Sequence, residues 1–514
     1  ECDLHREQPQ VADRTLESGD GFRSFLLQGS TGSGTTEVYL YRARRCIDQG
    51  KQVLFLVPEI SLTPQLVSRV RDHLGPGVRS LHSGLSDNER YKTWWLARAG
   101  RIPVVLGTRS AVFTPMARPG LIVVDEEHDP SYKQQDGFRY HARNMAIKRG
   151  SLEKVPVVMG SATPSLESLH NAREGRHTLL KLEQRYGDAR LPVIRIVDTG
   201  MYPPTNGLSA PVLEAIGQRL DQGEQTIVYV NRRGYAPVVH CYQCGWQAVC
   251  RHCTARLVYH RGQNQYRCHH CGWKQPADPR CPRCDTTLFL GGAGTQRLEQ
   301  ALLGRFPAAR LCRLDRDEAG TTGKLYQKLE QIRKGDVDIV IGTQLITKGH
   351  DFGRVSLVCV VSADQGLYSV DFRGPETLFQ QLLQVAGRAG RAELPGEVLV
   401  QTAHPDHPCI RMLAAHDYPA FAESELEQRQ TVGYPPFAFF ALFRAESTDP
   451  AAGIGFLNTV EQAGLRLRQD TGSSDVEILP PVSSPMEKVG GRFRFQLLVR
   501  APRREPLHRL LAPW

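Results

Sequence analysis

The chain has 514 residues, 40% of them hydrophobic and 23% charged, which is ordinary for a globular protein and enough for the cores of three or four domains. No apolar run approaches the roughly 18 residues needed to span a bilayer, so a helical membrane protein is excluded and no membrane partner is expected. The net charge of +10 favours a polyanionic partner, with a solvated basic surface as the alternative. The sequence runs from Glu1 to Trp514 without a starting Met, and we expect a fragment with a truncated C-terminal domain.

A glycine-rich turn follows the first short apolar run of the chain. Residues 29–36 read GSTGSGTT, between the apolar residues 25–27 and the start of an expected helix. This is the phosphate-binding pattern G-x-x-x-x-G-K-[ST] with its lysine replaced by Thr35. Glycines allow successive backbone N–H groups to face a phosphate, and the helix start adds partial positive charge. A glycine turn without a nucleotide is the alternative. The predicted nucleotide contacts are Gly29, Gly32, Ser33, Gly34, Thr35 and Thr36, the last through a hydroxyl that can reach magnesium.

Short runs of branched apolar residues recur along the chain, and each ends at a glycine or a polar residue. Such runs are typical of buried parallel strands, and ligands bind at the carboxyl ends of strands in open α/β sheets. Two successive sheets are therefore predicted. The runs lie at 53–57, 104–106, 121–124 and 155–159, and then at 226–230, 337–341 and 355–361.

Four polar residues, Asp125-Glu126-Glu127-His128, follow the run at 121–124. A carboxylate at a strand end can hold magnesium, and a neighbouring one can orient the attacking water. We predict the first role for Asp125 and the second for Glu126, with a simple polar turn as the alternative.

Residues 132–141 interleave aromatic and basic side chains around Gly137. Aromatic faces stack on unpaired bases, and we expect Lys133 and Arg139 to contact phosphates. Ordinary packing by Tyr132 and Phe138 explains the composition equally well.

Eight of the thirteen cysteines form four C-x-x-C pairs between positions 241 and 284. Reduced thiols that hold metal are the better interpretation, since nothing argues for an oxidising compartment. Eight thiolates are enough for two tetrahedral zinc sites, which are structural when closed. The 14 residues between the second and third pairs are close to the usual zinc-ribbon separation. One predicted site is Cys250, Cys253, Cys268 and Cys271, and the outer one is Cys241, Cys244, Cys281 and Cys284. Pairing in sequence order is the alternative.

The motifs together resemble superfamily 2 helicases. The glycine loop, the DEEH at 125–128, SATP at 161–164 and QVAGRAGR at 384–391 carry this resemblance. Finer matches are similar to the bacterial replication-restart, or primosomal, DNA helicases. They lie at 57–65, 82–85, 107–110, 131–135, 231–234 and 348–350, beside the cysteine block.

The resemblance implies an α/β protein of two tandem RecA-like parallel-sheet lobes with ATP between them. The expected domains are lobe 1 at 1–204, lobe 2 at 205–402 with a Cys-rich double zinc-binding insertion at 238–288, and an α+β C-terminal domain at 403–514. The resemblance also agrees with the nested zinc pairing, in which the two inner C-x-x-C pairs form one site and the two outer pairs form the other. By the same resemblance Gln8 reads adenine, Arg391 is the arginine finger and Arg388 assists it.

Thr35 decides the expected activity, because the family has lysine at this position. A charge-assisted hydrogen bond contributes roughly 1.5–3 kcal/mol, and losing such a preorganised contact typically costs on the order of 10²–10³ in rate. We expect two structural Zn²⁺ ions, weakly bound ATP and Mg²⁺, and little or no ATPase or unwinding.

The remaining role is that of a DNA-fork recogniser that recruits primosome proteins and single-stranded DNA-binding protein. An active DNA-dependent ATPase with 3′–5′ helicase activity is the alternative, and an RNA helicase fits the zinc insertion less well. By resemblance we expect a monomer in the bacterial cytoplasm, associated with the nucleoid.

Overall fold

The computed structural model separates into two compact units, which are described one at a time. The first comprises residues 1–193, 345–356 and 380–397, and the second comprises 194–344, 357–379 and 398–514. Within them the structure describes residues 8–16, 21–29, 33–59, 62–182, 191–230, 246, 248–252, 257–260, 264–267, 273–286, 294–314, 322–343, 345–346, 352–361, 363–367, 371–390 and 395–514.

The first unit is built on a seven-stranded sheet with the strand order β3-β4-β2-β5-β6-β1-β7. Each neighbouring pair runs parallel, and the runs predicted at 25–27, 53–57, 104–106, 121–124 and 155–159 each overlap one of these strands. The strands are β1 (Ser24–Gly29), β2 (Gln52–Leu56), β3 (Val78–Leu81), β4 (Val104–Gly107), β5 (Pro119–Val124), β6 (Val157–Ser161) and β7 (Thr178–Leu182). The helices are α1 (Gln8–Leu16), α2 (Thr35–Asp48), α3 (Pro64–Leu74), α4 (Asp87–Arg98), α5 (Ala142–Glu153) and α6 (Leu166–Arg173).

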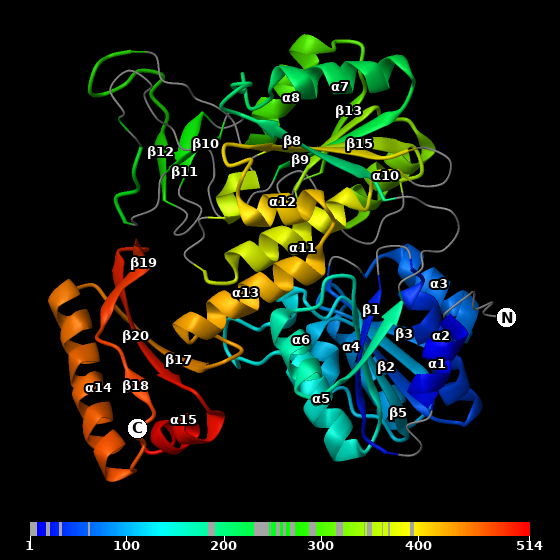
Figure 1. Cartoon of the computed structure of the whole chain (residues 1–514), viewed down its shortest axis with the longest axis vertical. Coiled ribbons are helices and arrows are strands. Elements are labelled where there is room, and N and C mark those ends of the chain that lie inside the picture. The colour runs from blue at the N-terminus through cyan, green and yellow to red at the C-terminus, as the bar shows by residue number, and fades with distance from the viewer. Residues whose placement is uncertain are drawn as a thin grey trace. The chain divides into compact units, whose positions relative to one another are not determined.

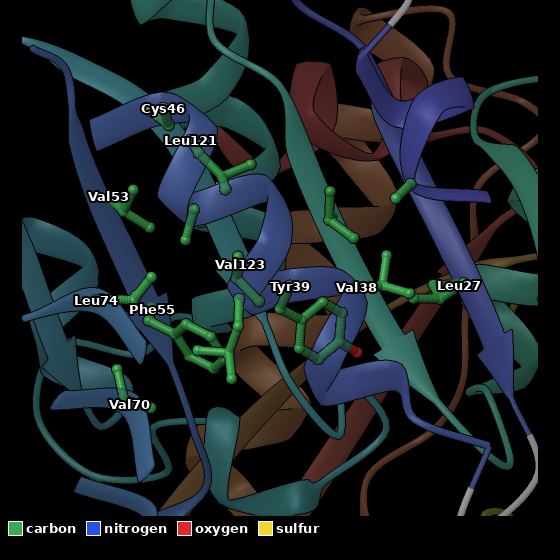
Figure 2. Packing of buried hydrophobic residues seen from close by; sticks show 14 of the residues in the cluster. Leu27, Val38, Tyr39, Cys46, Val53, Phe55, Val70, Leu74, Leu121 and Val123 are labelled. Carbon is green, nitrogen blue, oxygen red and sulfur yellow. The ribbon is translucent and has the colours of Figure 1, made fainter. Parts of the chain in front are cut away.

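Helices cover both faces of this sheet, which explains why its strands are apolar at every position. Alternate residues of one strand point to opposite faces. On β2, Phe55 packs with α1, α2 and α3, whereas Leu54 and Leu56 pack with α4 and α5. Figure 1 shows α2 and α3 on one side of the strands and α5 on the other. In Figure 2, Tyr39 of α2 lies beside Phe55, and the two rings meet edge to face at 5.7 Å.

The second unit contains most of a six-stranded sheet with the order β13-β14-β9-β15-β16-β8. β13, β14 and β9 pair in parallel, as predicted. α7 and α8 pack on one face through Val212, Ile216 and Leu302, and Figure 1 shows α12 on the other side. The elements that lie wholly or partly in this unit are β8 (Val193–Asp198), α7 (Ala210–Asp221), β9 (Gln225–Val230), α8 (Gly294–Arg305), β13 (Leu311–Leu314), α10 (Thr322–Lys334), β14 (Ile339–Gly342), β15 (Val355–Val361), α11 (Gly374–Ala386), β16 (Glu397–Thr402), α12 (Pro408–Ala414) and α13 (Tyr418–Val432).

The cysteine-rich segment, in the same unit, contains a small antiparallel sheet. The sheet consists of β10 (Val258–His260), β11 (Gln265–Arg267) and β12 (Lys274–Pro276). Trp246 and Trp273 pack against its buried cluster.

The C-terminal part of the second unit is an antiparallel sheet with helices. Its strands are β17 (Phe439–Ser447), β18 (Glu477–Ile478), β19 (Val482–Val489) and β20 (Arg492–Ala501), and β20 pairs with the other three. α14 (Pro450–Asp470) and α15 (Arg504–Leu511) pack on one face through Leu457, Leu507 and Leu510. In the described part of the chain, none of the helices combines the length and the apolar character that a membrane crossing requires.

Candidate functional site

The start of α2 has the backbone expected of a phosphate site. Gly34 precedes the helix with a φ of +81°, a left-handed conformation that glycine adopts without strain. No side chain caps the helix at Gly34, so its first N–H groups face outward from the helix end. The Ser33 hydroxyl is buried without a hydrogen-bond partner among the described atoms. An uncapped helix start beside an unsatisfied hydroxyl fits an anionic phosphate.

Two further predicted residues lie at this loop. Gln8 is buried, and its Nε2 donates to the carbonyl oxygen of Ser33 at 2.9 Å, so at least one amide hydrogen of the predicted adenine-reading residue is bound to the loop backbone. The Thr35 methyl group and the Ser33 hydroxyl lie so close to Gly29 that no Cβ would fit there. Thr36 follows in the first turn of α2. Gly32 lies outside the described residues.

Tyr39 joins this loop to the acidic motif, although sequence reasoning missed it. Its ring is buried, and its hydroxyl occupies the space that a side chain at Gly160 would need. Burial, together with the nearby carboxylates of Asp125 and Glu126, raises the pKa of Tyr39 well above its usual value. The only sequence signal was its place on the inward face of α2, one turn after Thr35.

The acidic motif stands at the carboxyl end of β5, as predicted. The Asp125 N–H donates to the carbonyl oxygen of Leu56 at 2.9 Å, which fixes it beside the end of β2. Glu126 adopts a left-handed conformation with φ of +47°, which turns its side chain out of the strand direction. Its carboxylate is one-third exposed, so it remains accessible to water.

A hydrogen-bond network connects Glu126 to two of the other motifs. Gln384 Nε2 donates to Glu126 Oε2 at 3.1 Å and lies 3.1 Å from His128 Nε2. His128 Nδ1 lies 2.6 Å from the hydroxyl oxygen of Ser161. These contacts are all satisfied when His128 carries its proton on Nδ1. Ser161 also accepts the N–H of Thr163 at 2.9 Å. The motifs at 125–128, 161–164 and 384–391 therefore meet in the first unit.

Glu127, to which the sequence assigned no role, is the most deeply buried member of the acidic motif. It is 0% exposed and accepts a hydrogen bond from Arg143 Nη1 at 2.7 Å. It also accepts the N–H of Ser165 at 2.6 Å and the hydroxyl of Ser168 at 2.8 Å. The carboxylate thereby binds the start of α6, directly after the Ser161–Thr163 segment. The only sequence signal for this buried role was that Glu127 is a third acidic residue directly after Asp125 and Glu126.

The aromatic loop at 132–141 is closed at its base. Lys133 and His141 form a β-bridge. For Tyr132 the packing alternative holds: its side chain is fully buried, and its hydroxyl donates to the carbonyl oxygen of Asp125 at 2.6 Å. Phe138 at the tip is 75% exposed and forms an aromatic cluster with Tyr140 and Phe113. The exposed aromatic surface thus begins after the first residue of the loop.

Arg388 is described and half-buried in the first unit. Arg391, the predicted arginine finger, lies outside the described residues.

Three of the eight paired cysteines lie in the described part of the chain, and their surroundings fit thiolate ligands. Cys250 and Cys281 are buried in one cluster, against which Cys284 packs. The N–H of His252 points to the sulfur of Cys250 at 3.3 Å, and the N–H of Arg283 points to that of Cys281 at 3.4 Å. Such donors stabilise a negatively charged sulfur. Cys241, Cys244, Cys253, Cys268 and Cys271 lie outside the described residues, and among the described ones no group of three potential ligands is assembled.

Comparisons with known proteins match every part of this architecture. Family models described as "DEAD/DEAH box helicase" and "Helicase conserved C-terminal domain" match residues 6–172 and 302–393. Models described as "PriA DNA helicase Cys-rich region (CRR) domain" and "Primosomal protein N C-terminal domain" match residues 250–276 and 430–514. The "Replication restart protein PriA" of Haemophilus influenzae is 43% identical, over 98% of this chain and 69% of that protein. The chain belongs to the PriA family.

Other PriA proteins agree over nearly the whole chain. The Bacillus subtilis relative is 40% identical over 97% of this chain, which corresponds to 62% of the relative. The Rickettsia conorii relative is 36% identical over 100% of this chain and 78% of its own length. The chain therefore spans between 62% and 78% of these three relatives.

The predicted PriA fold class is also confirmed. The chain has two parallel sheets of tandem RecA-like lobes, a Cys-rich zinc-ribbon domain and a C-terminal domain of antiparallel strands and helices. A solved structure, "Structure of RecG bound to three-way DNA junction", matches with a TM-score of 0.50 and 17% identity, over 83% of this chain and 47% of that one. This similarity concerns the fold alone.

Proposed function

We propose that this PriA-family chain acts in replication restart as a DNA-fork recogniser rather than as a working motor. It binds forked and single-stranded DNA as a monomer and recruits primosome proteins and single-stranded DNA-binding protein. The proposed role in replication restart is based on the PriA relatives, which are named replication restart proteins. The loss of motor activity is inferred from a single observation, that Thr35 occupies the first position of α2.

The loop retains a shape suited to phosphate but lacks the usual cation. Gly34 and the Ser33 hydroxyl suit a phosphate, and Thr36 with Asp125 would hold magnesium. Gln8 would meet the adenine, and Arg388 and Arg391 would approach the terminal phosphate. Threonine cannot supply the charge that lysine brings to the outer phosphates. ATP, when bound, supplies the phosphoryl group whose transfer to water drives unwinding.

The nearby Arg69 does not offer an obvious substitute. Its guanidinium forms an ion pair with Glu37 in the first turn of α2. The charge of Arg69 is thus offset by a carboxylate that would itself repel a triphosphate.

The alternative is an active DNA-dependent ATPase that unwinds in the 3′–5′ direction. The network of Glu126, His128 and Gln384 favours it, because the residue expected to orient the attacking water is held in place by another of the motifs. Electrostatic stabilisation at the phosphates usually contributes more to the rate than the orientation of water does, so we give more weight to Thr35.

The deciding experiment measures phosphate release from ATP with single-stranded DNA present. We expect little or no turnover by the chain and a gain of roughly 10²–10³ in Thr35→Lys. Thr35→Lys combined with Glu126→Gln is the matched control, in which the gain should be lost because the water is no longer activated. Robust turnover by the unaltered chain would defeat the proposal, and no gain in Thr35→Lys would show that activity was lost elsewhere.

DNA binding can be tested independently of turnover. We propose that the aromatic loop contacts single-stranded DNA through Phe138, which is exposed, with Arg139 and Lys133 reaching phosphates. Fluorescence anisotropy with labelled forks and single strands should show binding without ATP. Failure to bind either substrate would remove the recogniser role.

We further propose that two structural zinc ions hold the cysteine-rich segment. The family model for this region matches 250–276, which spans Cys250, Cys253, Cys268 and Cys271. The outer site would be Cys241, Cys244, Cys281 and Cys284. The boundaries proposed for the domains remain 1–204, 205–402 with 238–288 inserted, and 403–514.

A further inference from the structure

A hollow of about 350 Å³ lies on the first unit, between the end of β3, the helix α4 and the 3-10 helix η2 (Arg109–Phe113). Its walls include His82, Arg90, Tyr91, Trp94 and Phe113. A hollow of this volume is at the small end of the range for sites that hold small molecules. None of its lining residues belongs to the glycine loop or the acidic motif, and it shares Phe113 with the aromatic cluster described above.

Two of the aromatic side chains in the walls are exposed. Tyr91 is 64% exposed and Phe113 is 47% exposed. Large aromatic side chains beside a hollow offer flat faces on which a ring can stack. An aromatic ligand is therefore a better match than an aliphatic chain.

Phe113 joins the hollow to the aromatic loop. Its ring centroid is 4.8 Å from that of Tyr140 and 6.4 Å from that of Phe138. The aromatic cluster and the hollow thus form one continuous surface, with Phe113 shared between them. A DNA strand stacked on Phe138 would carry its next base toward the hollow.

The polar groups at the rim suit a nucleotide rather than a neutral aromatic molecule. Arg90 lines the hollow and pairs with Asp87 at 3.2 Å, but both side chains are exposed, so this pair is weak and Arg90 can turn to a phosphate. Arginines beside aromatic rings contact the backbone of single strands while bases stack. His82 accepts the N–H of Gly84 on Nδ1 at 3.2 Å, so its Nε2 carries the proton and can donate to a base edge.

We propose that this hollow accepts one unpaired base of single-stranded DNA, adjacent to the bases that stack on the aromatic loop. The proposal rests on the DNA binding proposed above and adds a defined position for one nucleotide. Tyr91 and Phe113 would provide the stacking faces, His82 a hydrogen-bond donor and Arg90 a contact to phosphate.

The first test compares two exposed aromatic residues of the same helix. Tyr91 lines the hollow, whereas Trp95, 46% exposed, is not among its lining residues. Binding of a labelled oligo(dT) to the full chain is measured by fluorescence anisotropy. Because removing one base–aromatic stack costs about 1–3 kcal/mol, Tyr91→Ala should weaken binding roughly 5- to 150-fold and Trp95→Ala by less than about twofold. Equal affinities of Tyr91→Ala and the unaltered chain would overturn the proposal, as would equal losses in both variants.

A second measurement locates the base itself. An abasic site is moved along the oligonucleotide one position at a time. One position should weaken binding to the unaltered chain, and the effect should disappear in Tyr91→Ala, because the partner of that base is already gone. A loss that persists unchanged in Tyr91→Ala means that the base lies elsewhere, and the proposal fails. DNA affinity that is insensitive to Tyr91→Ala at every position of the abasic site also overturns the proposal.

The two proposals fail in different ways. No binding of the unaltered chain to any oligonucleotide or fork would remove both. If the unaltered chain binds DNA, and its affinity is neither changed by Tyr91→Ala nor sensitive to the position of an abasic site, only the inference about the hollow is removed.

Discussion

Arg143 and Glu127 form a buried ion pair, with 2.7 Å between Nη1 and Oε2. Arg143 stands at the start of α5, two residues after the aromatic loop ends at His141. Glu127 directly follows Glu126. Tyr132, at the other end of the loop, donates to the carbonyl oxygen of Asp125. Both ends of the loop are thus attached to the strand end that carries the two acidic residues.

Breaking this pair should strongly destabilise the first unit. Removal of one partner leaves the other charge buried and costs about 3–5 kcal/mol. We therefore expect Arg143→Met to lower the free energy of unfolding by that amount in urea denaturation. Arg44→Met, which removes the ion pair with Asp48 on α2 of the same unit, is the control. Its cost should be below about 1 kcal/mol because both side chains of that pair are exposed. Similar losses in both variants would contradict the prediction.

Gly160 should tolerate no side chain while Tyr39 is present. A Cβ at Gly160 would overlap the Tyr39 hydroxyl, whose ring is packed between α2 and the sheet. We expect Gly160→Ala to cost about 1–3 kcal/mol in the free energy of unfolding, as overpacking does. Combining it with Tyr39→Phe, which removes the overlapping oxygen, should recover part of the loss. Strictly additive effects of the two changes would show that they are not in contact.

His177 should make stability depend on pH. Burial, with Arg143 nearby, lowers the pKa of His177, and its Nδ1 lies 2.8 Å from the Ser24 hydroxyl. The unfolded chain therefore binds the proton more readily, so stability rises with pH through the range just below the unfolded pKa of about 6.5. We expect the free energy of unfolding to fall as pH drops from 7 toward 5.

The contribution of His177 is isolated by His177→Asn, which does not titrate and can still bond to Ser24. The pH slope of the free energy of unfolding should decrease by less than about 1.4 kcal/mol per pH unit. Other histidines with a lowered pKa, such as His82 and His170, give a slope of the same sign that remains in the variant. An unchanged slope would refute the assignment.

Metal analysis of the purified chain should return two zinc ions. A chelator strong enough to remove them should unfold the segment around Cys250 and Cys281, because closed thiolate sites contribute directly to folding. The expected readout is faster proteolysis within 241–284. One ion or none would leave the nested assignment without support.

The sequence alone was sufficient for the strands and for the motifs at their ends. Runs such as 121–124 are apolar at every position because both faces of the sheet are covered, and this pattern is local. The order of strand and glycine turn likewise fixed where Gly34 and Thr36 would lie, since the helix must start there.

Only the tertiary structure decided which side chains are buried and which meet. Gln384 contacts Glu126 across 258 residues of sequence, and no local pattern encodes such a distance. Tyr132 and Phe138 lie in one aromatic segment, yet the first is fully buried and the second is 75% exposed. The difference arises because packing against β5 and η2 fixes the base of the loop while its tip projects into solvent, which composition does not reveal.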